Sequence, residues 1–237
     1  MRCETRIRRE LQITMIILTG CDKNTEWQLP WFIEKFRNKC AGTECKLVIA
    51  DFGMTKKMRQ QADLFADWVI DFQSDEGWFG KVRLFERCHT FFGDTKICWM
   101  DTDCEIRRLP TGIFDCIEPN KITMCVDRPW TENGSPWTPQ GNFGPWYNSG
   151  VVAWQGRPQV LVSWLQECEK GDHRGDQEAL YHYLNQDAGR RVTHIVEAPA
   201  KYNKLRLDLL QKRGPENPVI MHWTGQKGKD EIRRKMQ

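Results

Sequence analysis

The stretch Ile97-Cys98-Trp99-Met100-Asp101-Thr102-Asp103 sets two carboxylates directly behind a short apolar run. The run Ile97–Met100 predicts a buried strand that ends abruptly. Side chains at positions i and i+2 of an extended chain point to the same side, so Asp101 and Asp103 are expected to converge. In open α/β sheets, ligands bind outside the carboxyl ends of strands. The pair is therefore a candidate site for Mg²⁺ or Mn²⁺, although a turn with one capping aspartate has the same pattern.

On both sides of this motif, short apolar runs alternate with amphipathic stretches. The runs expected to form strands are Ile13–Thr19, Lys46–Ala50, Trp68–Ile70, Ile97–Met100, Lys121–Val126, Val151–Trp154, Val192–Val196 and Val219–Met221. The stretches expected to form helices are Pro30–Cys40, Lys56–Phe65, Trp78–Phe92, Pro158–Glu169 and Asp176–Asn185. This alternation predicts an α/β layered sheet with crossover helices.

The composition sets the broad class of protein. The 237 residues suffice for one large domain or two small ones. An aromatic content of 11% excludes a disordered chain. The 35 basic against 32 acidic residues leave a net charge of only +3, which excludes an obvious polyanion binder.

The cysteines and the N-terminus point to a compartment. The apolar run Met15–Leu18 is too short for the core of a signal peptide, and no stretch approaches the length of a membrane span. None of the ten cysteines forms a C-x-x-C pair. We therefore expect free thiols and a cytoplasmic protein.

The segment Asp127–Trp146 breaks the regular pattern, with four Pro, three Gly and three Trp. A loop of this length inside a domain is usually functional, so we predict an ordered lid or acceptor-binding loop. The alternative is a surface excursion that packs its own tryptophans. Asp127 at its start is a weaker candidate for a base or an acceptor ligand.

Four further features lie at expected strand or helix ends. Tyr147–Gly150 offers an amide and a hydroxyl before a strand, and Asp176 opens a helical stretch. His222 follows the last strand, and Lys81 lies near the start of the helix before the aspartate pair. Such groups can hold a metal or a phosphate. The plainer interpretations are a strand start, a helix cap, a core histidine and a solvated helix face.

The order of W-x-x-K-x-x-L-F, I-C-W-M-D-T-D, Y-N-S-G, D-Q-E-A-L and H-W-T-G resembles that of GT-A glycosyltransferases. The resemblance is to the family 8, galactosyltransferase-like retaining group and its small bacterial and phage relatives, over roughly Leu11 to Lys229. It implies a single-domain α/β GT-A fold with a mixed, mostly parallel sheet flanked by helices. It divides the chain into a nucleotide-binding half (11–103), an acceptor and sugar half (104–229) and a basic tail (230–237).

The resemblance also implies an activity and assigns residues to it. A sugar passes from a nucleotide-diphosphate sugar, above all a UDP-sugar, to a hydroxyl acceptor, with Mn²⁺ or Mg²⁺ as cofactor and retention of configuration. The metal ligands it implies are Asp101, Asp103 and His222. The residues it places around the donor are Thr19, Gly20, Asp22, Lys81, Thr102, Ser149, Gly150, Gly225, Lys227 and Lys229. The candidate catalytic residues are Asp176, Gln177 and Asn148.

The C-terminal end departs from the family pattern H-x-x-G-x-x-K-P-W. Here Gln226-Lys227-Gly228-Lys229 follows Gly225, so either lysine is a candidate for the diphosphate. The plainer interpretation of this basic segment is a solvated tail.

Two other functions compete with this interpretation. A nucleotidyltransferase usually has a Gly-rich phosphate loop, which Thr19–Asn24 is not. A non-catalytic module for sugar or nucleic acid explains the tryptophans but not the aligned carboxylates. The acceptor stays open between a saccharide or glycan, a protein and a hydroxylated base of DNA. Basic clusters at Arg6–Arg9, Lys56–Arg59 and Lys201–Arg213 can follow phosphates or be ordinary solvated faces.

Overall fold

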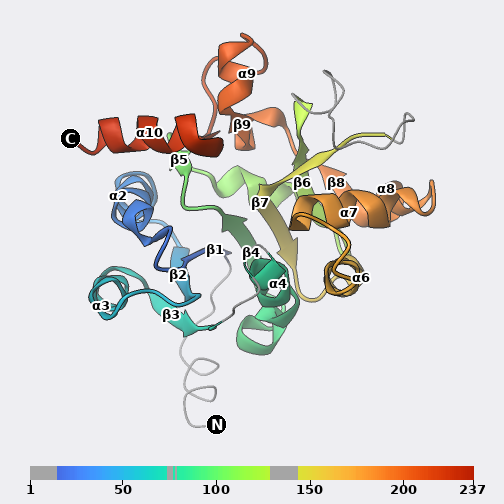
Figure 1. Ribbon diagram of the computed structural model, residues 1–237, viewed down its shortest axis with the longest axis horizontal. Coiled ribbons are helices and arrows are strands. Elements are labelled where there is room, and N and C mark those ends of the chain that lie inside the picture. Colours follow the sequence, from blue (N-terminus) through green and yellow to red (C-terminus); the bar gives the residue numbers. More distant parts are fainter. Residues whose placement is uncertain (1–14, 74–76, 78, 129–143) are drawn as a thin grey trace.

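A seven-stranded sheet forms the centre of the protein, whose computed structural model describes residues 15–73, 77, 79–128 and 144–237 (Figure 1). The strand order is β3-β2-β1-β4-β7-β6-β8. The strands are β1 (Met15–Cys21), β2 (Cys45–Asp51), β3 (Trp68–Asp71), β4 (Lys96–Met100), β6 (Ile122–Val126), β7 (Tyr147–Gln155) and β8 (Ile195–Glu197). Only β7 runs antiparallel to its neighbours β4 and β6. The predicted mixed, mostly parallel sheet is therefore confirmed.

A second sheet has the strand order β5-β10-β9. Its strands are β5 (Cys104–Ile106), β9 (Lys204–Leu205) and β10 (Ile220–His222). β5 begins directly after Asp103, and β10 ends on His222, which pairs in register with Cys104. This small sheet thus carries the late histidine to the end of β4.

Helices cover both faces of the large sheet. They are α2 (Leu29–Cys40), α3 (Lys56–Phe65), α4 (Phe79–Phe92), α6 (Gln159–Glu169), α7 (Asp176–Asn185), α8 (Arg190–His194), α9 (Arg206–Leu210) and α10 (Gly225–Lys235). Short 3₁₀ helices occupy Glu26–Gln28, Thr111–Cys116 and Ala200–Tyr202. Alternate residues of each strand face opposite ways. Ile17 therefore packs with α2, whereas Ile16 and Leu18 pack with α4 and α6. The chain thus has one core on each face of the sheet.

Two sequence predictions about secondary structure were wrong. The predicted strand Val192–Val196 begins only at Ile195, because Val192 lies in α8 with 77% of its surface exposed. The predicted basic tail 230–237 is largely helix α10, which Ile232 anchors in the core on the α2 side of the sheet. A single buried isoleucine among charged residues gives too weak a periodicity to predict that helix.

The predictions about the long loop, the cysteines and membrane spans can be compared with the structure only over its described residues. The loop Asp127–Trp146 lies mostly outside the described residues, although Trp146 at its end is buried with its ring 4.6 Å from that of Tyr181. Cys3 also lies outside them, and the other nine cysteines are unpaired thiols. Among the described residues, the helices are too short or too polar to cross a bilayer.

Candidate active site

Asp101, Asp103 and His222 converge at the end of β4. His222 Nε2 lies 3.0 Å from Asp103 Oδ1 and 4.0 Å from Asp101 Oδ2. Burial disfavours the charged imidazole, but the two carboxylates outweigh it and hold the pKa of His222 above its ordinary value. Trp99, two residues before Asp101 on the same side of the strand, donates its indole N–H to Asp101 Oδ1 at 2.6 Å. Both carboxylates face His222, but residues 101–104 form a turn, in which the backbone N–H of Cys104 donates to Asp101 O at 2.9 Å, and not the extended chain from which the convergence was predicted.

The distances from His222 Nε2 to the two carboxylates are short enough for shared binding of a hard divalent cation. Among the described residues, however, the ligand atoms that all lie within 4.8 Å of one another come from Asp103, Cys104 and His222 and not from Asp101. Asp103 Oδ1 is also buried and, apart from the imidazole nitrogen 3.0 Å away, has no hydrogen-bond partner. A buried carboxylate oxygen with so few partners is suited to a cation.

The neighbouring Cys104 contributes less to such a site. Its Sγ lies within 4.8 Å of ligand atoms of Asp103 and His222. Burial, with the charges of Asp103 and Asp101, holds the pKa of its thiol well above the ordinary value. The thiol faces the backbone oxygen of Gly150 at 3.7 Å. Mg²⁺ and Mn²⁺ prefer carboxylate oxygens to thiolate sulfur, so the carboxylates and the imidazole stay the proposed ligands.

Lys81 forms the buried positive charge beside these groups. Its Nζ lies 3.1 Å from Asp176 Oδ2, 3.5 Å from Asp101 Oδ1 and 3.1 Å from Ser149 Oγ. Burial opposes its charge, but Asp101 and Asp176 more than compensate and raise its pKa. Lys81 therefore ties the end of β4 to the start of α7 and to the start of β7. The donor contact expected for this lysine stays a prediction.

Asn148 and Gly150 at the start of β7 lie against the histidine. A Cβ on Gly150 would come within 2.0 Å of His222 Cε1, so the ring occupies space that only glycine leaves free. Asn148 Oδ1 accepts from the backbone N–H of Gly150 at 3.0 Å and from Asn203 Nδ2 at 2.9 Å. Gly150 of the N-S-G motif therefore leaves space for the His222 ring, and Asn148 of the same motif accepts a hydrogen bond from Asn203.

Asp127 and Gln177 form the other wall of the site. Asp127 Oδ2 accepts from Asn148 Nδ2 and from Gln177 Nε2, both at 3.1 Å. Gln177 Oε1 in turn accepts from the backbone N–H of Ser149 at 3.3 Å. Burial raises the pKa of Asp127 to about 6, although the two amide donors oppose the shift. Asp127, the weakest candidate from the sequence, is thus a buried carboxylate in contact with two stronger candidates.

Of the residues predicted to follow the first strand and meet the nucleotide, Thr19 and Gly20 lie within the last part of β1 and only Asp22 follows it. β1 pairs with β4 and ends at the same edge of the sheet. Thr19 is fully buried, and a Cβ on Gly20 would lie 2.6 Å from the ring of Phe52. The carboxylate of Asp22 accepts hydrogen bonds from Asn24 and Thr25 and so holds its own turn.

The predicted donor-binding residues at Thr102 and at Lys227 and Lys229 differ in the exposure of their side chains. Thr102 donates to Gln28 Oε1 at 3.0 Å and is buried. Lys227 is exposed and Lys229 half-buried in the first turns of α10, which starts at Gly225 with a φ of 71°. The N-cap Thr224 makes no side-chain capping bond. The first-turn N–H groups of α10 are thus open to an anion.

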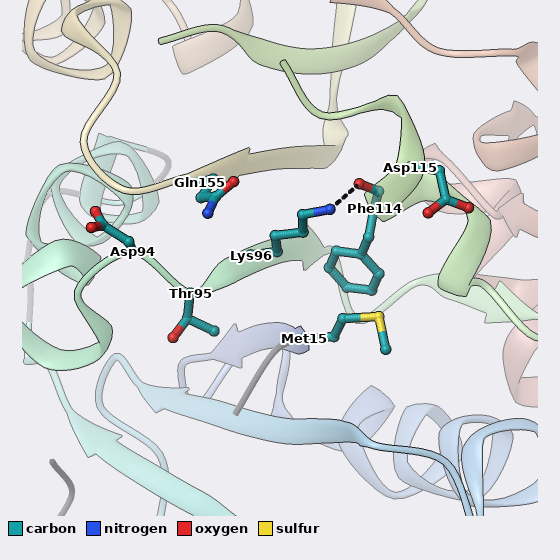
Figure 2. A pocket seen from close by; sticks show the side chains of 7 residues that line it. All are labelled: Met15, Asp94, Thr95, Lys96, Phe114, Asp115 and Gln155. Atoms are coloured by element: carbon teal, nitrogen blue, oxygen red, sulfur yellow. Dashed lines mark hydrogen bonds between the residues drawn. The ribbon is translucent and has the colours of Figure 1, made fainter. Parts of the chain in front are cut away.

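The sequence did not single out Asn203, Gln28 or Trp99. Trp99 lies two residues before the D-T-D motif, and its i, i+2 relation to Asp101 could have indicated the contact. Asn203 and Gln28 reach the site from distant segments, and nothing in their local sequence marks them. A hollow of about 570 Å³ lies elsewhere, lined by Met15, Asp94, Thr95, Lys96, Phe114, Asp115 and Gln155 (Figure 2). Because Lys96 begins β4, this hollow lies at the opposite end of the sheet.

Comparisons with known proteins define the class of fold. No protein-family model matches the sequence, and no curated protein is similar to it in sequence. Solved structures do match, and the fold is that of the GT-A glycosyltransferases. One is the galactosyltransferase LgtC in complex with donor and acceptor sugar analogues. It is 13% identical with a TM-score of 0.67, and the match covers 89% of this chain and 87% of LgtC.

Two larger glycosyltransferases have the same fold. GlyE of Streptococcus pneumoniae TIGR4 is 14% identical with a TM-score of 0.61, over 90% of this chain and 55% of GlyE. The bifunctional WbbM is 10% identical with a TM-score of 0.62, over 91% of this chain and 46% of WbbM. At these identities the likeness is one of fold, and it agrees with the fold that the five sequence motifs implied.

Proposed function

We propose that this protein is a metal-dependent glycosyltransferase that moves a sugar from a nucleotide-diphosphate sugar, a UDP-sugar, to a hydroxyl acceptor. The observation that carries the proposal is the convergence of Asp101, Asp103 and His222 at the carboxyl end of β4 in a GT-A fold. This is the place where open α/β sheets bind their ligands.

The proposed cofactor is Mn²⁺ or Mg²⁺, held by Asp101, Asp103 and His222. When bound, such an ion neutralises negative charge that develops on the departing diphosphate. The buried oxygen Oδ1 of Asp103, which lies 3.0 Å from His222 Nε2 and has no other hydrogen-bond partner, supports this assignment. Mg²⁺ and Mn²⁺ both prefer carboxylate oxygens, and an imidazole suits Mn²⁺ better.

The start of α10 is the proposed second anchor for the diphosphate. The uncapped N–H groups of its first turn carry partial positive charge, and Lys227 adds a full one. Lys229 lies a half-turn further along the same helix. Two residues separate His222 from Gly225, so cation site and helix start are neighbours in the chain. The lysines would stabilise the leaving diphosphate where its charge develops.

Asp176, Gln177 and Asn148 are the proposed groups around the sugar. Breaking the bond from the anomeric carbon to the diphosphate leaves the sugar oxocarbenium-like, and a nearby carboxylate or amide oxygen stabilises it. One similar LgtC structure is an active-site mutant with glutamine replaced by glutamate. We propose the corresponding place for Gln177, which contacts Asp127 and the backbone of Ser149.

The proposed acceptor is a saccharide hydroxyl, taken up with retention as the family 8 resemblance implies. The acceptor oxygen forms the new bond to the anomeric carbon and gives up its proton, and the nucleoside diphosphate leaves. Asp127, with a pKa near 6, is ionised at neutral pH and can take that proton.

Donor hydrolysis tests this function without knowledge of the acceptor. Purified protein is incubated with Mn²⁺ and a panel of nucleotide sugars, and released nucleoside diphosphate is measured by chromatography. We expect release from one donor, and its loss with EDTA and in Asp101→Asn. No release, with no metal-dependent thermal shift from any donor or from UDP, would move the assignment to a binding module. Transfer to hydroxymethylated DNA but to no saccharide would replace the proposed acceptor.

A further inference from the structure

A chain of buried hydrogen bonds runs from a backbone amide to the candidate metal-binding histidine. It begins at Gly150, whose backbone N–H donates to Asn148 at 3.0 Å. A backbone N–H is always a donor, so the atom of Asn148 that it meets must be the carbonyl oxygen. The other end of the same side chain then donates to the carboxylate of Asp127 at 3.1 Å, as it must. The orientation of the Asn148 amide is thereby fixed from both sides.

Asn203 takes its orientation from Asn148. The atom of Asn203 that lies 2.9 Å from the Asn148 oxygen has to be a donor, and it is therefore Nδ2. The opposite atom is the carbonyl oxygen, which lies 3.0 Å from His222 Nδ1. Asn203 is only 2% exposed, so water cannot readily replace either contact.

His222 is the last member of the chain. Because Asn203 presents an acceptor, it stabilises a proton on Nδ1 of the imidazole. The other nitrogen, Nε2, faces the carboxylates of Asp103 and Asp101, which favour a proton on Nε2 while no cation is bound. A cation needs the form with the proton on Nδ1 and the lone pair on Nε2, and Asn203 is the group that stabilises this form.

We propose that Asn203 is a positioning residue that selects the tautomer of His222 able to bind the cation. The metal in this inference rests on the proposed function. The tautomer of His222 does not, because it can be observed in the metal-free protein. Partners on the second ring nitrogen are a general feature of metal-binding histidines, and their loss weakens metal binding about 10–100-fold. Here the backbone N–H of Gly150 in β7 fixes the orientation of Asn148, which in turn fixes the orientation of Asn203.

Two substitutions at Asn203 separate tautomer selection from packing. Asn203→Leu has nearly the same size but offers no acceptor to His222 Nδ1. Asn203→Asp keeps an acceptor for His222 Nδ1, loses the donor to Asn148 and adds a buried negative charge. The dissociation constant for Mn²⁺ is measured by electron paramagnetic resonance, and folding is checked by denaturant unfolding. We expect Asn203→Leu to raise this constant about 10–100-fold and Asn203→Asp to retain more of the affinity.

Asn185→Leu provides the matched control. Asn185 in α7 also makes two side-chain contacts, to Tyr181 O and from Arg191, but neither reaches the site. We expect it to lose some stability while its Mn²⁺ affinity stays that of the wild type. Equal affinities for Asn203→Leu and the wild type would overturn the proposal.

The tautomer itself is read by ¹⁵N NMR of the imidazole in metal-free protein. At a pH high enough for the spectrum to show a neutral ring, we expect a larger share of the Nδ1-protonated form in the wild type than in Asn203→Leu. An equal share of the two forms in the wild type and in Asn203→Leu would overturn the inference. Failure of the wild type to bind Mn²⁺ while the NMR result holds would count against the proposed function instead.

Discussion

The two ends of the seven-stranded sheet contain the same kinds of side chain in different arrangements. At the carboxyl end of β4, Lys81 is buried between Asp101 and Asp176. At the opposite end, Lys96 lies between Asp94 and Asp115, which are both exposed (Figure 2). The ammonium of Lys96 donates to the backbone oxygen of Phe114 at 3.1 Å rather than to either carboxylate.

The difference shows why a hollow is not by itself a site. The opposite end has a hollow of about 570 Å³, but its carboxylates are exposed to solvent. At the carboxyl end, buried carboxylate oxygens have few partners: Asp127 Oδ1 accepts no hydrogen bond, Asp103 Oδ1 lies 3.0 Å from His222 Nε2, and Asp176 Oδ2 lies 3.1 Å from Lys81 Nζ. Groups held out of water without full partners are those from which a ligand gains the most. Matched substitutions at the two ends test this distinction.

The largest contrast is expected between Asp103→Asn and Asp115→Asn. The first removes a proposed metal ligand, and the second changes a solvated carboxylate. We expect metal-dependent donor hydrolysis to fall more than about 100-fold in Asp103→Asn, since even outer partners of metal ligands contribute 10–100-fold. Asp115→Asn should keep wild-type turnover. Similar losses in both variants, measured as nucleoside diphosphate released, would erase the contrast between the two ends.

The next contrast is between Lys81→Met and Lys96→Met. Removing Lys81 leaves two largely buried carboxylates without their cation, which costs about 3 kcal/mol or more in the free energy of unfolding. Lys96→Met loses one partly exposed hydrogen bond to a carbonyl, worth about 1 kcal/mol. Denaturant unfolding of both variants measures the difference. Equal losses would mean that Asp101 and Asp176 are hydrated without Lys81.

The sequence predicted a site at the carboxyl end of β4, but not the packing that completes this site. The D-T-D pair was predictable because an apolar strand and an i, i+2 spacing are local signals. The strands β2, β4 and β7 were predictable for the same reason. β9 has only two residues, and β5 only three, so neither has a period to detect. Yet these two strands flank β10 and place Asn203 beside His222.

The roles of individual residues were likewise predictable only where a local pattern marks them. Lys81 was predicted as a group that reaches a ligand, but in the structure two carboxylates take up its charge. Only tertiary packing decides whether a conspicuous lysine is free or paired. Asn203 is the converse case, since it has an unremarkable sequence context and a decisive position. Local pattern thus predicts which groups are present at the site, and packing decides which of them have partners.

Gly150→Ala and Gly156→Ala give a smaller contrast. A Cβ at Gly150 would lie 2.0 Å from the ring of His222, so the histidine must move. We expect a loss of about 1–3 kcal/mol in unfolding free energy and weaker Mn²⁺ binding. At the opposite end, Gly156 has a φ of 65°, and alanine there costs about 1–2 kcal/mol from the backbone alone. Mn²⁺ affinity, measured for both, should fall only in Gly150→Ala.

The last contrast we expect is a change in the pH dependence of stability, in Asp127→Asn. Burial raises the pKa of Asp127 from 3.8 to about 6, so the folded protein holds this proton where the unfolded chain has lost it. Wild-type stability should therefore fall, relative to the variant, as pH rises from about 4 to about 6, by at most about 1.4 kcal/mol per pH unit. Above that window the difference should stay constant.

Asp115→Asn is again the matched control, because an exposed carboxylate has no reason to change the slope. Denaturant unfolding at several pH values between 4 and 8 gives the three curves. Parallel curves for Asp127→Asn and the wild type would show that water reaches Asp127 and that burial does not raise the pKa of its carboxyl group. A divergence confined to the acid window would show that the carboxyl end of the sheet maintains a carboxylate at a cost in stability, as a residue poised to take a proton requires.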